Sequence, residues 1–225
     1  MKRYNMFNQI HKGLRAMLYE TGLLLLHTDF AIADEAVKAM EQLTELLELF
    51  DKHADTEDYF VLPLLEQFEP SVSCIFEEEH VQDHALSNKL RKLHILFQEA
   101  DNEYARTETG SAIRVSFVEF MVFNLDHMAK EENVINHLLW KYQTDEQLRQ
   151  VTQQILAKIG PAEMFRTAKW MMRGLNNTEI IIWLNEVKAN APGFVFNNLM
   201  EILDAELPEQ RKQVIMSGVG AEIFA

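Results

Sequence analysis

Three pairs of side chains stand four residues apart in this chain, and each pair could bind a metal ion. They occur in the segments HADTE, HVQDH and HMAKE, at residues 53–57, 80–84 and 127–131. Residues four apart on a helix lie about 40° apart around its axis and roughly 6 Å apart along it, so both side chains can reach one target. A single such pair is usually a solvated surface contact. A metal site is therefore indicated only if the pairs meet.

Long helices must position these pairs, because apolar residues recur every three or four positions and strand-like alternation is nearly absent. The pattern predicts an all-α fold: an up-down-up-down four-helix bundle followed by a C-terminal appendage of short helices. The four long helices are expected at about residues 5–27, 30–68, 71 or 73–106, and from the end of a loop to 142. The stretch TETGSA at 107–112 is the clearest loop in the sequence.

After residue 142, residues that begin and end helices become more frequent in the sequence. Thr144 and Gln147 bound a capping-box pattern, and Gly160-Pro161 is a helix stop followed by a helix start. Further Asn, Pro and Gly pairs cut the remainder into helices of about three turns each. The sequence therefore predicts a bundle domain at 1–142 and a helical C-terminal extension at 143–225.

The depth of the pairs in the predicted bundle is an independent test. Up-down topology places the beginnings of helices one and three at the same end as the terminations of helices two and four. Counted from that end, the pairs lie about two to three turns in, and so does His11, whose face continues with Leu14 and Leu18. Seven residues are thus predicted in one layer: His11, His53, Glu57, His80, His84, His127 and Glu131. Such a layer is tolerable in a core only with a bound cation, so a metal centre is predicted.

An internal repeat indicates two metals rather than one. His11 and His53 are 42 residues apart, His84 and His127 are 43 apart, and H-x-x-x-E closes each half. Each half supplies two imidazoles and one carboxylate. His80 has no counterpart, because Phe7 stands four residues before His11, so His80 is predicted to be an extra ligand of one metal.

Taken together, these motifs resemble those of the hemerythrin-like, HHE cation-binding family of non-haem di-iron proteins, over residues from about 5 to 142. The resemblance implies two iron ions with an oxo or hydroxo bridge, for which manganese or zinc can substitute. It implies this ligand set: one iron with His80, His84 and His127, the other with His11 and His53, and Glu57 and Glu131 bridging both.

The last carboxylate departs from the pattern of the oxygen carriers. Oxygen-carrying hemerythrins use H-x-x-x-x-D, whereas this chain offers Glu131 at four and Glu132 at five residues after His127. The four-residue spacing is found in the family's nitrosative-stress repair and iron-sensing branches, and it matches His53 with Glu57. We therefore expect Glu131 to be the bridge.

Counting ligands leaves one coordination position open, on the two-histidine iron. Phe7, Leu14 and Phe50 lie one turn from His11 and His53, so the pocket there should be small and apolar. We expect a protein that binds or senses O2 or NO, takes up peroxide, or stores iron. The alternative is a di-iron enzyme of nitrosative or oxidative stress defence, which reduces NO or peroxide or repairs iron–sulfur clusters. A third interpretation is an interaction module in which iron is a switch.

Two asparagines offer support around the ligands. Asn88 and Asn124 lie one turn from His84 and His127, where each could accept a hydrogen bond from the free N–H of a ligand histidine. A polar residue at the edge of the bundle is the alternative interpretation for both.

Composition disfavours several partners. The net charge of −14 and the absence of a Lys/Arg stripe argue against nucleic acid and anionic membrane surfaces. Cys74 is the only cysteine, which excludes an internal disulfide and fits a reducing compartment. The longest apolar run, GLLLLHTDFAIA, is broken by His27 and Asp29, and no signal-peptide pattern precedes it. We expect a cytoplasmic protein, with a homodimer or protein-partner contact through the C-terminal extension.

Overall fold

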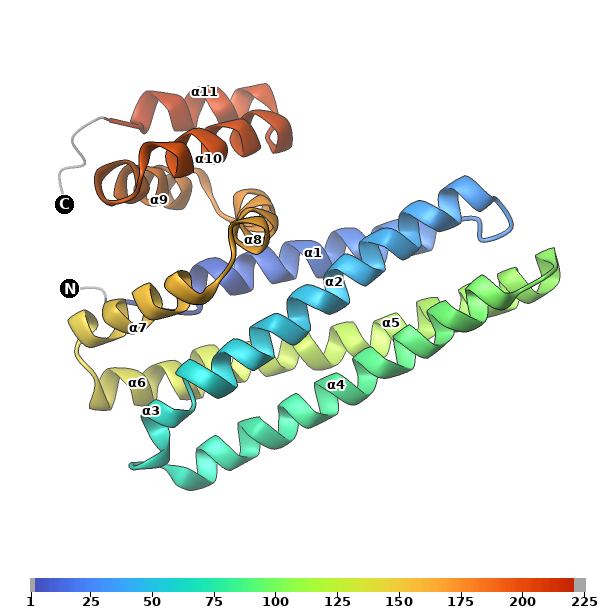
Figure 1. The fold of residues 1–225 in the computed structure, drawn as a ribbon, viewed down its shortest axis with the longest axis horizontal. Coiled ribbons are helices and arrows are strands. Elements are labelled where there is room, and N and C mark those ends of the chain that lie inside the picture. Colours follow the sequence, from blue (N-terminus) through green and yellow to red (C-terminus); the bar gives the residue numbers. More distant parts are fainter. Residues whose placement is uncertain (1–2, 221–225) are drawn as a thin grey trace. The chain divides into compact units, whose positions relative to one another are not determined.

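The computed structural model describes residues 3–220, and within that range the regular structure is entirely helical (Figure 1). The all-α prediction is therefore confirmed. None of the helices in this range combines the length and the apolar character needed to cross a membrane. The chain forms two compact units. Of the described residues, 3–7 and 17–155 form one unit, and 8–16 and 156–220 form the other.

The first unit contains the long helices that carry the paired side chains. Its elements are α1 (Asn8–His27, from residue 17 on), α2 (Ala33–Phe60), α3 (Pro63–Glu66), α4 (Pro70–Glu99), α5 (Glu103–Lys130), the π-helix η1 (Glu131–Ile135), α6 (Asn136–Tyr142) and most of α7 (Asp145–Lys158). Figure 1 shows α2, α4 and α5 running alongside one another, with the chain reversing direction between them.

The second predicted helix ends earlier than expected. Helix α2 stops at Phe60 instead of continuing to residue 68, and the short α3 begins at Pro63. Proline lacks the backbone N–H that would continue the ladder of hydrogen bonds, and its ring clashes with the preceding turn. The backbone N–H groups of Val61 and Leu62 both donate to the Glu57 carbonyl, each at 2.9 Å, and so close the end of α2.

The predicted loop at 107–112 is wrong, because these residues lie inside α5. The chain instead reverses at 100–102, where the Asn102 side chain accepts a hydrogen bond from the Ala105 N–H at 2.9 Å and caps α5. Gly110 is helical for a packing reason: a Cβ there would lie 2.2 Å from the Phe30 ring. Gly110 thus permits close packing of a helix and does not mark a loop.

In the first unit, apolar core residues pack on both sides of the layer that contains the predicted ligands. Phe50 of α2 and Phe120 of α5 are both buried and meet edge to face with ring centroids 5.3 Å apart. A second apolar cluster lies beyond the ligand layer, toward the ends of α2 and α6, and includes Phe7, Val61, Phe76 and Leu139. Burial on both sides leaves the polar layer between them with little access to water.

The second unit is built from α8 (Pro161–Gly174), α9 (Asn177–Asn190), α10 (Gly193–Glu206), α11 (Glu209–Gly218) and residues 8–16 of α1. The predicted helix start at Pro161 is confirmed, as is the capping box between Thr144 and Gln147 at the start of α7. Gly174 allows α8 to approach α1 closely, since a Cβ there would lie 2.2 Å from the Lys12 carbonyl oxygen. The domain ranges 1–142 and 143–225 stay a prediction.

Candidate metal centre

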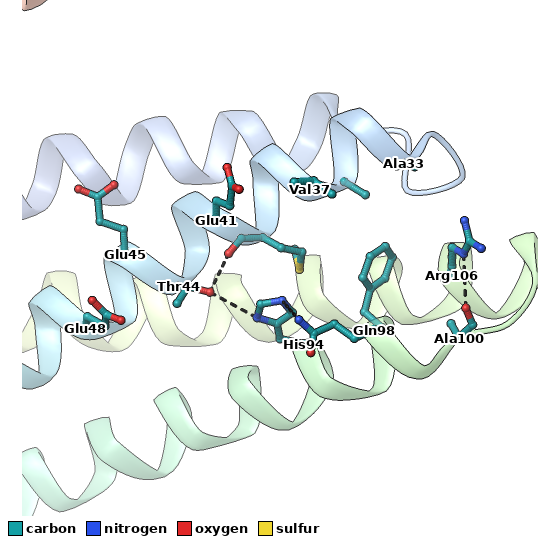
Figure 2. A pocket seen from close by; sticks show the side chains of 13 residues that line it. Ala33, Val37, Glu41, Thr44, Glu45, Glu48, His94, Gln98, Ala100 and Arg106 are labelled. Carbon is teal, nitrogen blue, oxygen red and sulfur yellow. Dashed lines mark hydrogen bonds between the residues drawn. The ribbon is translucent and has the colours of Figure 1, made fainter.

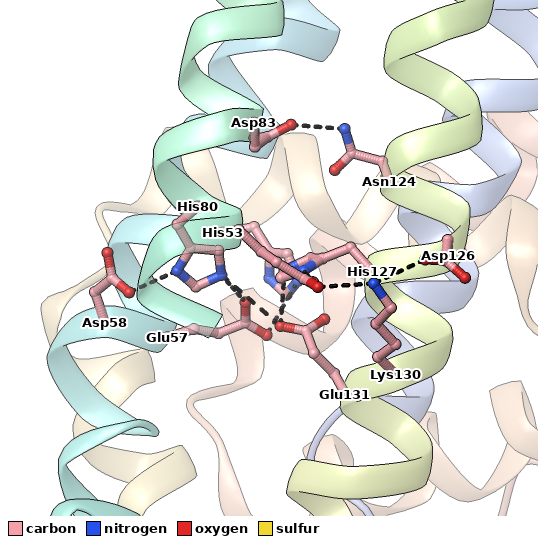
Figure 3. Close-up of polar contacts among 11 residues, drawn as sticks. His53, Glu57, Asp58, His80, Asp83, Asn124, Asp126, His127, Lys130 and Glu131 are labelled. Atoms are coloured by element: carbon pink, nitrogen blue, oxygen red, sulfur yellow. Dashed lines mark hydrogen bonds and ion pairs between the residues drawn. The ribbon is translucent and has the colours of Figure 1, made fainter. Parts of the chain in front are cut away.

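Four buried side chains from three helices converge in the first unit. They are Glu57 of α2, His80 of α4, His127 of α5 and Glu131 at the start of η1 (Figure 3). Each is at most 4% exposed, and one ligand atom of each lies within 4.8 Å of a ligand atom of every other. Two imidazoles and two carboxylates this close and this deeply buried are a donor set suited to a metal ion.

The ring nitrogens of the two histidines point at the carboxylates. His127 Nε2 lies 3.1 Å from Glu131 Oε1, and His80 Nε2 lies 3.5 Å from Glu57 Oε2 and 3.9 Å from Glu131 Oε1. The two rings meet edge to face with centroids 4.9 Å apart. The Nε2 atoms of His80 and His127 thus face the same two carboxylates, which is the arrangement that coordination of one metal through Nε2 requires.

The other nitrogen of each ring is held by a carboxylate outside the group. His80 Nδ1 lies 2.5 Å from Asp58 Oδ1, and His127 Nδ1 lies 2.7 Å from Glu79 Oε2. Because an ionised carboxylate can only accept a hydrogen bond, each Nδ1 donates and keeps its proton. This leaves Nε2 as the nitrogen that could coordinate a metal ion, and the carboxylate raises its basicity.

The protonation of both histidines responds to the same carboxylates. Burial lowers the pKa of His80, but the carboxylates of Glu131 and Glu57 outweigh it, so the pKa is raised to about 11. Burial likewise lowers the pKa of His127, and Glu131 again outweighs it, so that pKa is also raised. The metal-free group therefore holds a proton on His80 where a cation would bind, and a metal would have to displace it.

His53 belongs to a second group that shares both glutamates. Its Nε2 lies 3.2 Å from Glu57 Oε1, and its ligand atom lies within 4.8 Å of those of Glu57 and Glu131. One carboxylate pair thus serves His80 and His127 in one group and His53 in the other. That sharing is the arrangement expected of two carboxylates that bridge two metals.

The two H-x-x-x-E pairs are followed by similar backbone geometry. The Glu131 carbonyl accepts a hydrogen bond from the N–H of Asn136, and the Glu57 carbonyl accepts one from the N–H of Leu62, in both cases five residues ahead. Single π-turns of this kind are frequent at functional sites. The sequence repeat thus extends to the local fold, which the 3.6-residue periodicity did not predict.

The remaining predicted ligands lie differently. His84 is 38% exposed at its side chain, its Nδ1 lies 3.3 Å from Asp51 Oδ1, and it is not among the grouped side chains of the described residues. This arrangement gives no support to the prediction that His84 is a ligand. His11 is fully buried, but it lies in the part of α1 that packs with the second unit, so its membership of the centre stays a prediction.

The hydrogen-bond acceptors of the two histidines, Asp58 and Glu79, were not predicted from the sequence. The two asparagines that were considered for this role, Asn88 and Asn124, do not fill it. Asp58 follows Glu57 and Glu79 precedes His80, so an acid adjacent to a ligand was the available signal. Asn124 bonds Asp83 Oδ1 at 2.6 Å rather than a histidine (Figure 3). Asn88 is exposed. Burial raises the pKa of Asp83, which sits one turn above His80 on α4.

A groove of about 680 Å³ lies elsewhere in the first unit, between α2 and the C-terminal part of α4 (Figure 2). His94 lines it, with Thr44 Oγ1 3.3 Å from His94 Nδ1. Burial lowers the pKa of His94, which favours a neutral ring. None of the predicted ligands lines this groove, so we interpret His94 as a structural histidine.

Comparison with known proteins yields distant relatives. The chain is 24% identical over 136 residues to F-box/LRR-repeat protein 5 of Xenopus tropicalis, which covers 60% of this chain and 19% of that protein. It is 23% identical over 152 residues to F-box/LRR-repeat protein 5 of Salmo salar, covering 68% of this chain and 21% of that protein. The chain therefore spans about a fifth of the length of these relatives. No family model and no solved structure matches it.

Proposed function

We propose that this protein is a hemerythrin-like non-haem di-iron protein on an up-down-up-down four-helix bundle, located in the cytoplasm. The observation that carries the proposal is that Glu57 and Glu131 belong to both groups of potential ligands. Two carboxylates shared by two sets of imidazoles fit a pair of cations better than one, because each bridge offsets the repulsion between the ions.

The ligand set of the proposal combines the structure with the sequence repeat. His80 and His127 would hold one iron, and His53 together with the predicted His11 would hold the other, with Glu57 and Glu131 bridging. Mixed imidazole and carboxylate donors suit iron, and manganese or zinc would fit the same atoms. Bound ferrous iron would supply a coordination position that a small ligand can occupy and leave, and electrons that it could share with that ligand.

The chain's own residues would keep that ligand small and the site dry. Phe7 and Phe50, predicted beside the open position, are 3% and 2% exposed. Such surroundings favour O2, NO or peroxide over a polar organic substrate. We infer reversible binding or sensing of O2 or NO, or iron storage, as the function. The alternative is a di-iron enzyme that reduces NO or peroxide or repairs iron–sulfur clusters, which the four-residue spacing of His127 and Glu131 favours.

One experiment separates these functions. Iron would be added anaerobically, the metal content would be measured, and the di-ferrous protein would be exposed first to O2 and then to NO while its optical spectrum is followed. A spectrum that changes on gas addition and returns on gas removal supports binding or sensing. Continued consumption of NO or peroxide with a supplied reductant supports the enzyme. About one metal or none per chain contradicts the di-iron proposal, since two ions require two sites.

A further inference from the structure

Helix α5 carries an apolar stripe that faces away from its buried side. Val115, Val118 and Val122 are 61%, 51% and 59% exposed, and the half-buried Leu125 continues the same line. The spacing of three, four and three residues is that of a heptad seam, in which apolar side chains on one helix meet those of a partner helix. Exposed and contiguous apolar surface of this kind marks an interaction site.

Helix α1 extends the stripe on one flank. Tyr19, Leu23 and Leu26 are 52%, 54% and 68% exposed. Helix α1 lies directly beside α5 here, since a Cβ on Gly22 would be 3.4 Å from the Phe117 ring. The six residues together are called the apolar face: Tyr19, Leu23, Leu26, Val115, Val118 and Val122.

Helix α4 flanks the stripe on the other side and leaves a groove there. A salt bridge of 2.6 Å between Lys89 and Glu119 joins α4 to α5. The groove, of about 350 Å³, is lined by these residues: Ala85, Lys89, Lys92, Leu93, Ala112 and Ser116. Three small side chains, one leucine and two lysines therefore form a recess next to the apolar face.

We propose that the apolar face joins two copies of this chain, with the two α5 helices parallel about a twofold axis. Such an interface is self-complementary, so the α1 side of the stripe in one copy must fit the α4 side of the stripe in the other copy. In parallel coiled coils, β-branched residues at the first seam position, here Val115 and Val122, favour two helices over three or four when leucine follows at the second position, as at Leu125. In a parallel pair, the residue that precedes a first seam position lies opposite the partner's residue whose number is five higher. Arg114, which precedes Val115, would therefore lie opposite Glu119 of the partner subunit. These two side chains carry opposite charges.

The heights of the protrusion and the recess agree. Phe30, three residues after the end of α1, packs on Gly110, and Gly22 of α1 packs on Phe117, so Leu23 and Leu26 lie at the height of the segment that includes Ala112 and Ser116. A parallel twofold axis preserves height along the helices and places the α1 flank of one copy against the α4 flank of the other. Leu23 and Leu26 of each copy would then cover the groove of its partner.

The first test is the mass in solution. Full-length protein, measured by sedimentation or light scattering over a range of concentrations, should approach twice the chain mass of 26.2 kDa. Val118→Glu should weaken association at least about tenfold, because it would place an unpaired charge in the seam. The matched control is Val81→Glu on α4, where Val81 is 70% exposed and outside the apolar face. Helix content by circular dichroism checks the fold of both variants.

A second test reports the orientation. With Cys74 changed to Ser, Val122→Cys would place one thiol opposite its own copy in a parallel pair, so mild oxidation should give a covalent dimer. Val81→Cys is the control and should give no covalent dimer. A wild-type chain that remains a monomer at every concentration, Val118→Glu that associates like wild type, or Val122→Cys that does not cross-link would each overturn the proposal.

Discussion

His127 and Glu79 are joined by a hydrogen bond of 2.7 Å between Nδ1 and Oε2, and the same glutamate holds Lys130 through Oε1 at 2.7 Å. The pKa of Glu79 is lowered: burial raises it, but His127 and Lys130 together outweigh burial. The carboxylate is thus an anion whose position is fixed from two directions. It orients the His127 ring so that Nε2 faces Glu131.

Glu79→Gln should weaken metal binding by about ten- to a hundredfold, the usual effect of losing a carboxylate behind a coordinating histidine. The amide can accept from Nδ1 but carries no charge to raise the basicity of the ring. Affinity would be measured by competition with a chromophoric chelator. Glu77→Gln is the matched control, since Glu77 is exposed two residues away, and it should bind metal like wild type.

Loss of either shared carboxylate should cost more metal than loss of its neighbour. Glu57→Gln and Glu131→Gln should each reduce the iron content by at least about one ion per chain, because a bridge contacts both ions. Glu132→Gln should keep the wild-type content, as only Glu131 lies in the groups. Elemental analysis of reconstituted protein decides it. Metal loss in Glu132→Gln with Glu131→Gln unaffected would reverse this assignment.

Metal binding near neutral pH should release protons. The pKa of His80 is raised to about 11, so its ring is protonated at pH 7 in the metal-free protein, and the pKa of His127 is also raised, which favours its protonated form. At least about one proton should leave as the metal binds, and affinity should increase with pH. Calorimetry in buffers of different ionisation enthalpy counts them, and His80→Ala should release about one fewer. Equal release by both proteins would contradict the protonated state.

The same raised pKa sets the sign of the pH dependence of stability in the metal-free protein. A group whose pKa is higher when folded stabilises the fold fully below its unfolded value, and this contribution is lost as pH rises through the folded value. For His80 the window runs from 6.5 to about 11. Metal-free protein should therefore unfold at lower denaturant concentration as pH rises from neutral to alkaline. His80→Ala should lose part of that slope.

His80→Ala and His84→Ala should differ, although the two residues lie one turn apart. His80 is 2% exposed and faces Glu57, whereas the His84 side chain is 38% exposed and faces Asp51. We expect His80→Ala to lower metal affinity about tenfold or more and His84→Ala to leave it unchanged. If both variants lose metal, the ligand set implied by the family resemblance is the correct one, and His84 turns inward when metal is bound.

Gly110→Ala should destabilise the first unit by about 1–3 kcal/mol, because the new methyl group would overlap the buried Phe30 ring. Thermal and denaturant unfolding would measure the effect. Gly193→Ala is the control, as a Cβ there meets no atom within 4 Å, and its effect should stay within about 0.5 kcal/mol. A Gly110→Ala variant as stable as wild type would mean that Phe30 moves aside without cost.

The sequence alone determined the helical class and the pairing of side chains, since both follow from local periodicity. A separation of four residues on a helix places His127 and Glu131 side by side whatever surrounds them, and the structure has them 3.1 Å apart. Capping at Thr144 and Gln147 is local as well and was predictable. The helix end at Phe60 was signalled by Pro63, although the prediction ran past it.

Only the tertiary structure decided which of two neighbouring histidines faces the centre. His80 and His84 share one stripe of α4, and the rotation of that helix against α2 turns the first toward Glu57 and the second toward Asp51. The hydrogen bonds of Asp58 to His80 and of Glu79 to His127 also cross between helices, so no sequence spacing encodes them. Gly110 is the reverse case: its sequence context is typical of a loop, and contact with Phe30 keeps it helical. Periodicity specifies the face of a helix only to within its width, and packing against neighbouring helices selects the residue.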